Sequence, residues 1–316
     1  MATYPDRKEP VRAPSAYSEP LPINPREAVL GTQNAILSGT GKQYYVPDYE
    51  GCLSIKTVVR GSATWEAARR RFVVHENSYL ILNDRQRYTI TIDSARDVTT
   101  FCLFFQRGFV EDVFRGTVTP ETDLLDSPQL PNSLPLAFRE RLETGRNGLL
   151  GSIWKLRDRI LEGVTSRQAL EENFFEIAGE MVREHKHGDS AAAKLPALRP
   201  STRQELYLRL LRGRDYLLSS LDQPIRLSDI AQAACLSPYH FHRTFTRAFG
   251  ETPQRYLTRQ RLERAALLLG QKERSVMEVC LECGFESPSS FSSLFRQHFG
   301  VSPREFKRRT IRQLAR

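Results

Sequence analysis

Residues 236–257, LSPYHFHRTFTRAFGETPQRYL, recur fifty positions later as residues 286–307, ESPSSFSSLFRQHFGVSPREFK. The matching positions include Ser237/Ser287, Pro238/Pro288, Phe241/Phe291, Phe245/Phe295, Phe249/Phe299, Gly250/Gly300 and Pro253/Pro303. Self-similarity at a fixed spacing indicates a duplicated structural unit. This duplication decides the fold of the C-terminal third of the chain.

Each copy carries the signals of one short, bounded helix. A serine occupies the N-cap position, a proline follows at the first helical position, and a glycine ends the segment. Phenylalanines at i, i+4 and i+8 fall on one helical face, which predicts that this face is buried. The opposite face is polar, and a capped helix with outward polar groups can enter the major groove of DNA.

A second helix is expected before each of these. Residues 228–234 (SDIAQAA) and 275–283 (SVMEVCLEC) are predicted to form supporting helices, each joined by a three- or four-residue turn to the helix that follows. This order is typical of a helix-turn-helix motif, in which the second helix contacts bases and the first crosses the backbone. The sequence therefore predicts two such motifs in tandem.

Charge is distributed unevenly along the 316 residues. The formal net charge is +9. Residues 201–316 contain 20 Lys and Arg against 11 Asp and Glu, whereas residues 1–200 contain 26 of each. Because Lys and Arg displace counterions from phosphates, a basic segment attached to a neutral one indicates a nucleic-acid module with a separate sensing or assembly domain.

The first 200 residues change character three times. Residues 1–27 contain six prolines and are expected to form a flexible or extended leader. Residues 28–105 hold β-rich runs at 53–65, 70–83, 88–94 and 97–105, which favour an antiparallel barrel or roll. Residues 108–187 take a helical period, and residues 188–200, rich in Ala and Pro, are the expected linker between a 28–187 domain and a 201–316 domain.

Two amphipathic helices are expected in the 108–187 region, because apolar residues recur there at intervals of three or four. They are Ile153, Leu156, Ile160 and Val164 in the first helix, and Leu170, Phe174, Ile177 and Met181 in the second.

Over about residues 205–312 the chain resembles the AraC/XylS family of bacterial transcription regulators. The likeness rests on LSDIAQAACLSPYHFHRTFTRAFGETPQRYLTRQRLERAALLL (227–269) and VCLECGFESPSSFSSLFRQHFGVSPREFKR (279–308). The resemblance implies two recognition helices held by a connecting helix over residues 253–269 and placed in successive major grooves of double-stranded DNA. It further implies an α+β chain with an N-terminal cupin-like antiparallel β-barrel, a helical dimerisation segment and an all-α DNA-binding domain.

The resemblance also suggests the DNA contacts, position by position. Expected base-reading residues are Tyr239, His242, Arg243, Ser289, Ser290, Ser293 and Arg296, with Ser292 on the same outward face. Expected phosphate contacts are Ser237, Arg247, Arg255, Ser287, Lys307, Arg308 and Arg309. The second recognition helix carries small hydroxyls where many family members carry longer donors, so either Arg296 compensates or that helix mainly contacts phosphates.

In the barrel, four aromatic residues are candidates for an effector pocket: Trp65, Tyr79, Tyr88 and Phe104. Ordinary core packing is the alternative for each. The β segment holds a single histidine, His75, expected at a turn or on the surface, so no metal or cofactor is expected. Cys280 and Cys283 fall where the first copy has Ala231 and Ala234, which favours a packing role over redox chemistry.

The sequence thus predicts a cytosolic, non-enzymatic regulator that binds DNA as a homodimer, responds to a small molecule, and contacts RNA polymerase if it activates transcription. No stretch approaches 18 apolar residues, so no membrane association is expected, and five scattered cysteines do not resemble a disulfide framework. The alternatives are control by a protein partner or by abundance. Two enzymatic alternatives, a cupin-type oxygenase and a cysteine alkyl transferase, lack the expected His cluster and activated cysteine.

Overall fold

The computed structural model describes residues 23–25, 30–118, 136–145, 148–164, 166–187, 195, 199–271 and 273–314. The chain divides into two compact units, Met1–Gly188 and Asp189–Arg316. Most of the expected leader (1–27) and of the expected linker (188–200) lies outside the described residues.

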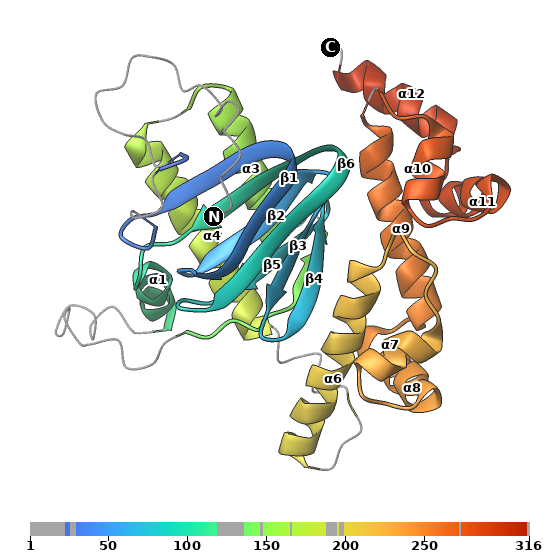
Figure 1. Ribbon diagram of the computed structural model, residues 1–316, viewed down its shortest axis with the longest axis horizontal. Coiled ribbons are helices and arrows are strands. Elements are labelled where there is room, and N and C mark those ends of the chain that lie inside the picture. Colours follow the sequence, from blue (N-terminus) through green and yellow to red (C-terminus); the bar gives the residue numbers. More distant parts are fainter. Residues whose placement is uncertain are drawn as a thin grey trace. The chain divides into compact units, whose positions relative to one another are not determined.

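The first unit is built on one antiparallel sheet that curls into a nearly closed barrel (Figure 1). Its strands are β1 Ala35–Glu50, β2 Ser54–Arg60, β3 Ser62–Ala67, β4 Arg70–His75, β5 Ser78–Leu82, β6 Arg87–Phe104 and β7 Leu142–Thr144. They follow the order β4-β3-β6-β2-β5-β7, and β1 also pairs with β6. The expectation of an antiparallel β-barrel is therefore confirmed.

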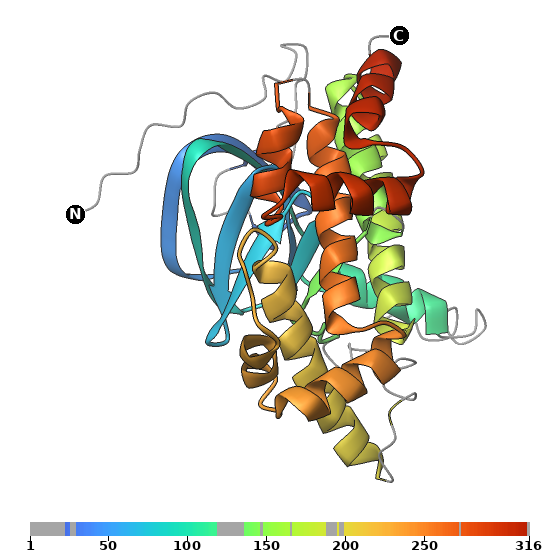
Figure 2. The ribbon, with the colours of Figure 1, turned by 90° about the vertical axis from the view of Figure 1, so that its right-hand side faces the viewer.

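The longest feature of the barrel is the ribbon formed by β1 and β6, which Figure 2 shows as a curved arch. Its register runs from Ala35 opposite Phe104 to Glu50 opposite Arg87, with two irregularities along the way. The runs at 88–94 and 97–105, expected as separate strands, belong to the single strand β6. The residues between the two runs stay extended although the β1–β6 register shifts there, between Gly41 and Gln43.

The two faces of the sheet have different neighbours. One face packs on helices α1 Phe109–Val118, α3 Leu149–Leu161 and α4 Arg167–His187. From the sheet it contributes Ile55, Tyr79, Ile81, Phe101 and Leu103 to a single core. Since side chains alternate along a strand, the intervening residues Ser54, Lys56, Leu80, Leu82 and Phe104 face the inside of the barrel.

In the described part of the 108–187 region, α1, α3 and α4 are helical as expected, whereas residues 136–144 are not. In α3, Ile153, Leu156 and Ile160 are buried, while Val164 lies beyond the end of the helix; in α4 all four predicted apolar residues are buried. Strand β7 lies within residues 136–144 and pairs with β5, so that Ser78 lies opposite Thr144. Three residues are too few to display a strand's alternating pattern, so only the partner strand reveals β7.

The second unit is entirely helical in its described part. Its helices are α6 Pro200–Ser219, α7 Leu227–Ala233, α8 Pro238–Phe249, α9 Pro253–Leu269, α10 Val276–Glu282, α11 Pro288–Phe299 and α12 Pro303–Leu314. The connecting helix predicted over 253–269 is α9; α7 and α8 lie at one end of it, and α10 and α11 at the other (Figures 1 and 2). Among the residues described in both units, no helix is long and apolar enough to span a membrane.

Candidate DNA-binding site

Helix α8 is bounded by the signals that its sequence predicts. The Ser237 hydroxyl accepts a hydrogen bond from the backbone N–H of His240 at 3.3 Å, and Pro238 is the first helical residue. Gly250 ends the helix in the left-handed conformation, with φ +77°, which glycine adopts without strain. Phe241 and Phe245 are completely buried, so the opposite face is the one available to a partner.

Helix α11 repeats this construction. The Ser287 hydroxyl accepts from the backbone N–H of Ser290 at 3.3 Å, and Gly300 ends the helix with φ +76°. Phe291 and Phe295 are completely buried, with their ring centroids 5.6 Å apart. The predicted duplication is therefore a duplication of structure.

The turns between supporting and recognition helices also correspond. Cys235 and Gly284 occupy equivalent positions, and both take the left-handed conformation, with φ of +53° and +71°. Just before them, Ala234 and Cys283 are both fully buried. The C-x-x-C pair thus packs beneath the second motif, as expected, while Cys235 is exposed in the turn of the first.

The outward face of α8 carries long polar side chains. Tyr239 is 75 % exposed, and His242 and Arg243 are also exposed. Within the described part of the chain, the Arg243 guanidinium pairs with no carboxylate. It is therefore free to donate to a base edge or a phosphate, and its role in base readout stays a prediction.

The outward face of α11 carries shorter side chains, and two of them hydrogen-bond to each other. Ser289, Ser290, Ser293 and Arg296 are exposed, whereas Ser292 is half-buried. The hydroxyls of Ser287 and Ser289 lie 2.8 Å apart and share a hydrogen bond. Arg296 is thus the long donor on a face of short hydroxyls.

The two motifs are similar to those of known proteins. A family model described as a helix-turn-helix domain matches residues 230–309. The regulator ArgR of Pseudomonas aeruginosa is 37 % identical over 87 residues, which are 28 % of this chain and 26 % of ArgR. The activator RhaS of Escherichia coli O1:K1 is 29 % identical over 183 residues, which are 54 % of this chain and 62 % of RhaS.

The chain contains a helix-turn-helix domain of the AraC type.

It spans less than two thirds of the length of these relatives. Among solved structures, an AraC-type transcriptional regulator from Chromobacterium violaceum is 29 % identical with a TM-score of 0.31, covering 35 % of this chain and 96 % of that one.

The predicted phosphate contacts differ in how available their side chains are. The Ser237 and Ser287 hydroxyls already cap α8 and α11. The Lys307 ammonium donates to the backbone carbonyl of Arg274, and Arg309 pairs with Glu305 at 2.5 Å. Side chains that are exposed and have no partner in the described residues are those of Arg247, Arg255 and Arg308.

Some exposed polar residues on the same helices were not predicted from the sequence. His240 lies in the first turn of α8, and Arg304 lies in the first turn of α12. Gln297 and His298 are exposed near the end of α11. Gln297 lies one helical turn after Ser293, the equivalent of Arg243, so helical spacing could have identified it. His240 and Arg304 could have been identified because each lies in the first turn of a helix, where backbone N–H groups attract anions.

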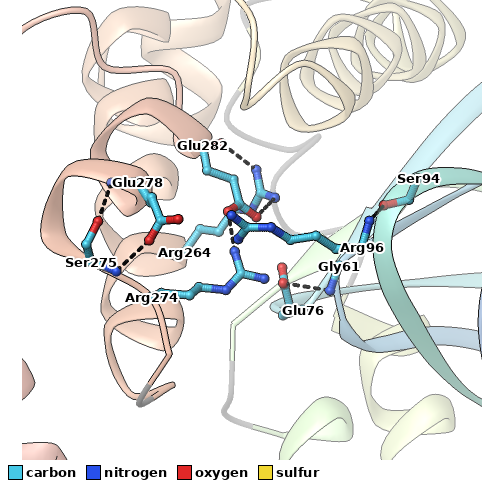
Figure 3. Close-up of polar contacts among 9 residues, drawn as sticks. All are labelled: Gly61, Glu76, Ser94, Arg96, Arg264, Arg274, Ser275, Glu278 and Glu282. Atoms are coloured by element: carbon cyan, nitrogen blue, oxygen red, sulfur yellow. Dashed lines mark hydrogen bonds and ion pairs between the residues drawn. The ribbon is translucent and has the colours of Figure 1, made fainter.

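The second motif is held to α9 by a buried cluster (Figure 3). Arg264 and Arg274 are each 4 % exposed, and both contact the Glu282 carboxylate. At the start of α10, Ser275 and Glu278 form a capping box, with hydrogen bonds of 2.8 and 3.1 Å to each other's backbone N–H groups. These contacts determine how α10, and the turn that follows it, sit on the connecting helix.

Arg261 ties α9 to the end of α6. Its guanidinium donates to the carbonyl oxygens of Leu221 at 2.8 Å and Gln223 at 2.6 Å. The turn of the second motif packs against the same carbonyl group. A Cβ added at Gly284 would lie only 2.6 Å from the Leu221 carbonyl oxygen. The two motifs are thus joined by more than the covalent chain.

In the first unit, the four candidate pocket aromatics do not share a face. Trp65, Tyr88 and Phe104 are buried on the inner side of the barrel, whereas Tyr79 faces the helices and donates from its hydroxyl to Glu184 of α4. Tyr79 is buried and Glu184 half-buried, and desolvation raises the pKa of the Tyr79 hydroxyl and of the Glu184 carboxyl. Tyr79 therefore belongs to the barrel–helix contact.

The inner side also holds Lys56, which the sequence pattern did not single out. Lys56 is 1 % exposed, and its ammonium donates to the Tyr88 hydroxyl at 3.0 Å.

His75 ends β4 directly before the turn at residues 76–77 and is 2 % exposed, so of the two expected positions the surface one is wrong. The folding of β4 against β3 and β5 encloses it. Its neighbour Glu76 accepts a hydrogen bond from the backbone N–H of Gly61 at 2.9 Å (Figure 3). The described residues contain no group of three or more His, Cys, Asp or Glu side chains placed to hold a metal ion.

Proposed function

We propose that the chain binds double-stranded DNA at specific sequences through α8 and α11 and regulates transcription. The observation that carries the proposal is the repeated helix itself. Each copy is capped at both ends, buries its phenylalanines and presents a polar face, and the two copies lie at opposite ends of α9. Two recognition helices on one connecting helix suit successive major grooves, about 34–36 Å apart along B-DNA.

The two helices are proposed to contribute unequally. Helix α8 offers Tyr239, His242 and Arg243 as donors that reach base edges, whereas α11 offers serines and Arg296. Contacts to phosphates position a protein on the duplex without reading its sequence. We infer that α8 supplies most of the specificity and that α11, together with Arg308, supplies mainly position.

The N-terminal unit is proposed to control this binding. A small molecule in the barrel is the favoured input, and α3 and α4 are proposed to form a homodimer contact. Leu161 and Phe175 support the dimer, because they are 58 % and 60 % exposed on these helices. Because the named relatives are transcription regulators, we propose no enzymatic reaction for the chain. We propose that it acts in the cytosol. If it activates transcription, RNA polymerase is its proposed partner.

Chromatin mapping of the tagged full-length chain in its native host tests the DNA-binding proposal. Fluorescence anisotropy then compares a mapped site with a scrambled duplex of equal composition, across a salt series. We expect at least about 10³-fold preference for the mapped site. Equal affinity for the two duplexes at every salt concentration would refute sequence-specific binding.

A further inference from the structure

A lysine lies in the middle of β2 with its charge inside the barrel. The Lys56 ammonium is 3.9 Å from the centroid of the Phe104 ring and 4.4 Å from that of Tyr88, and it donates to the Tyr88 hydroxyl. In the part of the chain that the structure describes, no carboxylate pairs with it. The inner face thus contains a cation that the folded chain does not neutralise.

Such a charge is costly to bury. An ammonium in an apolar interior ordinarily takes a carboxylate partner, and aromatic faces replace only part of that interaction. Burial lowers the pKa of Lys56 from 10.5 to about 8, so the group is still largely protonated at neutral pH. A leucine or methionine would pack the same position without this cost.

A second polar group on the same strand is also unsatisfied. Ser54 precedes Lys56 by two residues and therefore points to the same side of β2. It is fully buried, and its hydroxyl has no hydrogen-bond partner among the described residues. The two residues are about 6.6 Å apart along the strand, so the ammonium and the hydroxyl both line the inner side of β2.

The surroundings of this pair are apolar. Directly across on β5, Leu82 lies opposite Ser54 and Leu80 lies opposite Lys56. Across the other side, Phe104 of β6 lies opposite Ser54. The Lys56 ammonium can balance one negative charge, and the leucines and aromatic rings around it favour an apolar body.

We propose that the inside of the barrel binds a small monocarboxylic acid with an aromatic or aliphatic body. Its carboxylate is held by the Lys56 ammonium and the Ser54 hydroxyl. This inference rests on the proposed small-molecule control and names the chemical class of the effector.

A route for such a ligand begins at Tyr88. This residue contacts Lys56 on the inner side and also lines a solvent-exposed pocket of about 400 Å³. Four arginines, at positions 69–71 and 87, line the pocket against the two carboxylates of Asp48 and Glu66. The net positive charge attracts anions, so the tyrosine side chain stands between an anion-attracting surface and the buried ammonium.

Thermal unfolding of the full-length protein tests the inference. The probes are benzoate and decanoate, each compared with its uncharged counterpart, benzyl alcohol or decan-1-ol. We expect at least one acid to raise Tm by about 5 °C at a hundredfold excess over its Kd. The uncharged counterpart should leave Tm unchanged.

Two variants and a control localise the effect. Lys56→Met should abolish the acid-induced shift, and Ser54→Ala should weaken acid binding about tenfold, as expected for one hydrogen bond to a charged group. Lys42→Met makes the same substitution at an exposed lysine of β1 and should retain the full shift. Lys56→Met must unfold cooperatively at a Tm no lower than that of the unaltered protein, which excludes simple misfolding.

Three outcomes would overturn the inference: no shift with either acid, equal shifts with acids and alcohols, or an undiminished shift in Lys56→Met. Anisotropy with the mapped DNA site is measured on the same samples. Specific DNA binding without an acid-dependent shift would refute the carboxylate site and leave the DNA-binding function standing. Loss of DNA specificity in the unaltered protein would instead refute the proposed function.

Discussion

Arg264 of α9 and Glu282 of α10 are joined twice. The guanidinium donates to the Glu282 carbonyl oxygen at 3.2 Å and lies 3.7 Å from its carboxylate. Arg274 contacts the same carboxylate from the segment before α10. One acidic side chain therefore offsets two guanidinium groups that are almost completely buried, and this sets the position of the second motif on the connecting helix.

Glu282→Gln should destabilise the second unit by about 3 kcal/mol, because two buried cations lose their anionic partner while the side-chain shape is kept. Urea unfolding followed by hydrogen exchange of α10 and α11 measures the change. Glu286→Gln removes an exposed carboxylate nearby and is the control, with an expected change within about 0.5 kcal/mol. Equal protection of α10 in the two variants would show that the cluster does not hold this helix.

Gly284→Ala should cost more than Cys235→Ala, although the two positions are equivalent in the repeat. At Gly284 the backbone has φ +71°, and an added Cβ would lie 2.6 Å from the Leu221 carbonyl oxygen and 2.8 Å from the Arg261 guanidinium. The left-handed conformation alone costs about 1–2 kcal/mol, and displacing Arg261 adds to it.

Cys235 already holds a side chain in the left-handed region and is exposed, so Cys235→Ala should change stability by less than about 0.5 kcal/mol. Differential scanning calorimetry compares the pair. A Gly284→Ala protein as stable as Cys235→Ala would contradict the close packing of the second turn.

Arg243→Ala should weaken binding to the mapped DNA site by about 1–3 kcal/mol and leave binding to random DNA nearly unchanged, if Arg243 makes a bidentate base contact. Arg247→Ala lies one turn further along α8 and is predicted to contact phosphate. It should lower both affinities alike and reduce the salt slope by about one. Equal losses on the two duplexes for Arg243→Ala would place Arg243 among the phosphate contacts.

Lys56→Met should stabilise the protein at pH 7 and lose that advantage as pH rises. Between pH 8 and 10.5 the folded protein binds fewer protons than the unfolded chain, because the folded pKa of Lys56 is about 8. The free energy of unfolding of the unaltered protein therefore rises with pH in this window. Below pH 8 the buried charge costs about 3 kcal/mol, and the lost hydrogen bond to Tyr88 offsets about 1 kcal/mol of the gain.

Urea unfolding at pH 7 and pH 9.5 checks this expectation. The groups facing the ammonium are the Tyr88 hydroxyl and the thiols of Cys52 and Cys102, and burial raises the pKa of both thiols. Lys56 is the group in this cluster whose pKa is lowered, to about 8, so it titrates first as pH rises. If Lys56→Met brings no gain in the free energy of unfolding at pH 7, the Lys56 ammonium is already stabilised by its surroundings in the folded protein.

Much of the second unit could be predicted from the sequence, because its determinants are local. The N-cap serines, the phenylalanines at i, i+4 and i+8, and the terminal glycines all act within one helix and its adjoining turn. The α8 and α11 boundaries and the α9 range follow from these signals. The contacts of Arg264 and Arg261 could not be predicted, because their partners lie 18 to 40 positions away along the chain.

The sequence alone determined the repeated capped helix and the basic C-terminal third, and these sufficed to predict two helix-turn-helix motifs. The barrel is the opposite case. Both faces of β2 are buried, so alternation separates Lys56 from Ile55 without showing which one faces the helices. Only tertiary structure decided that Lys56 and Ser54 point into the barrel and that Tyr79 points toward α4, because strand pairing and helix packing between distant segments define inside and outside.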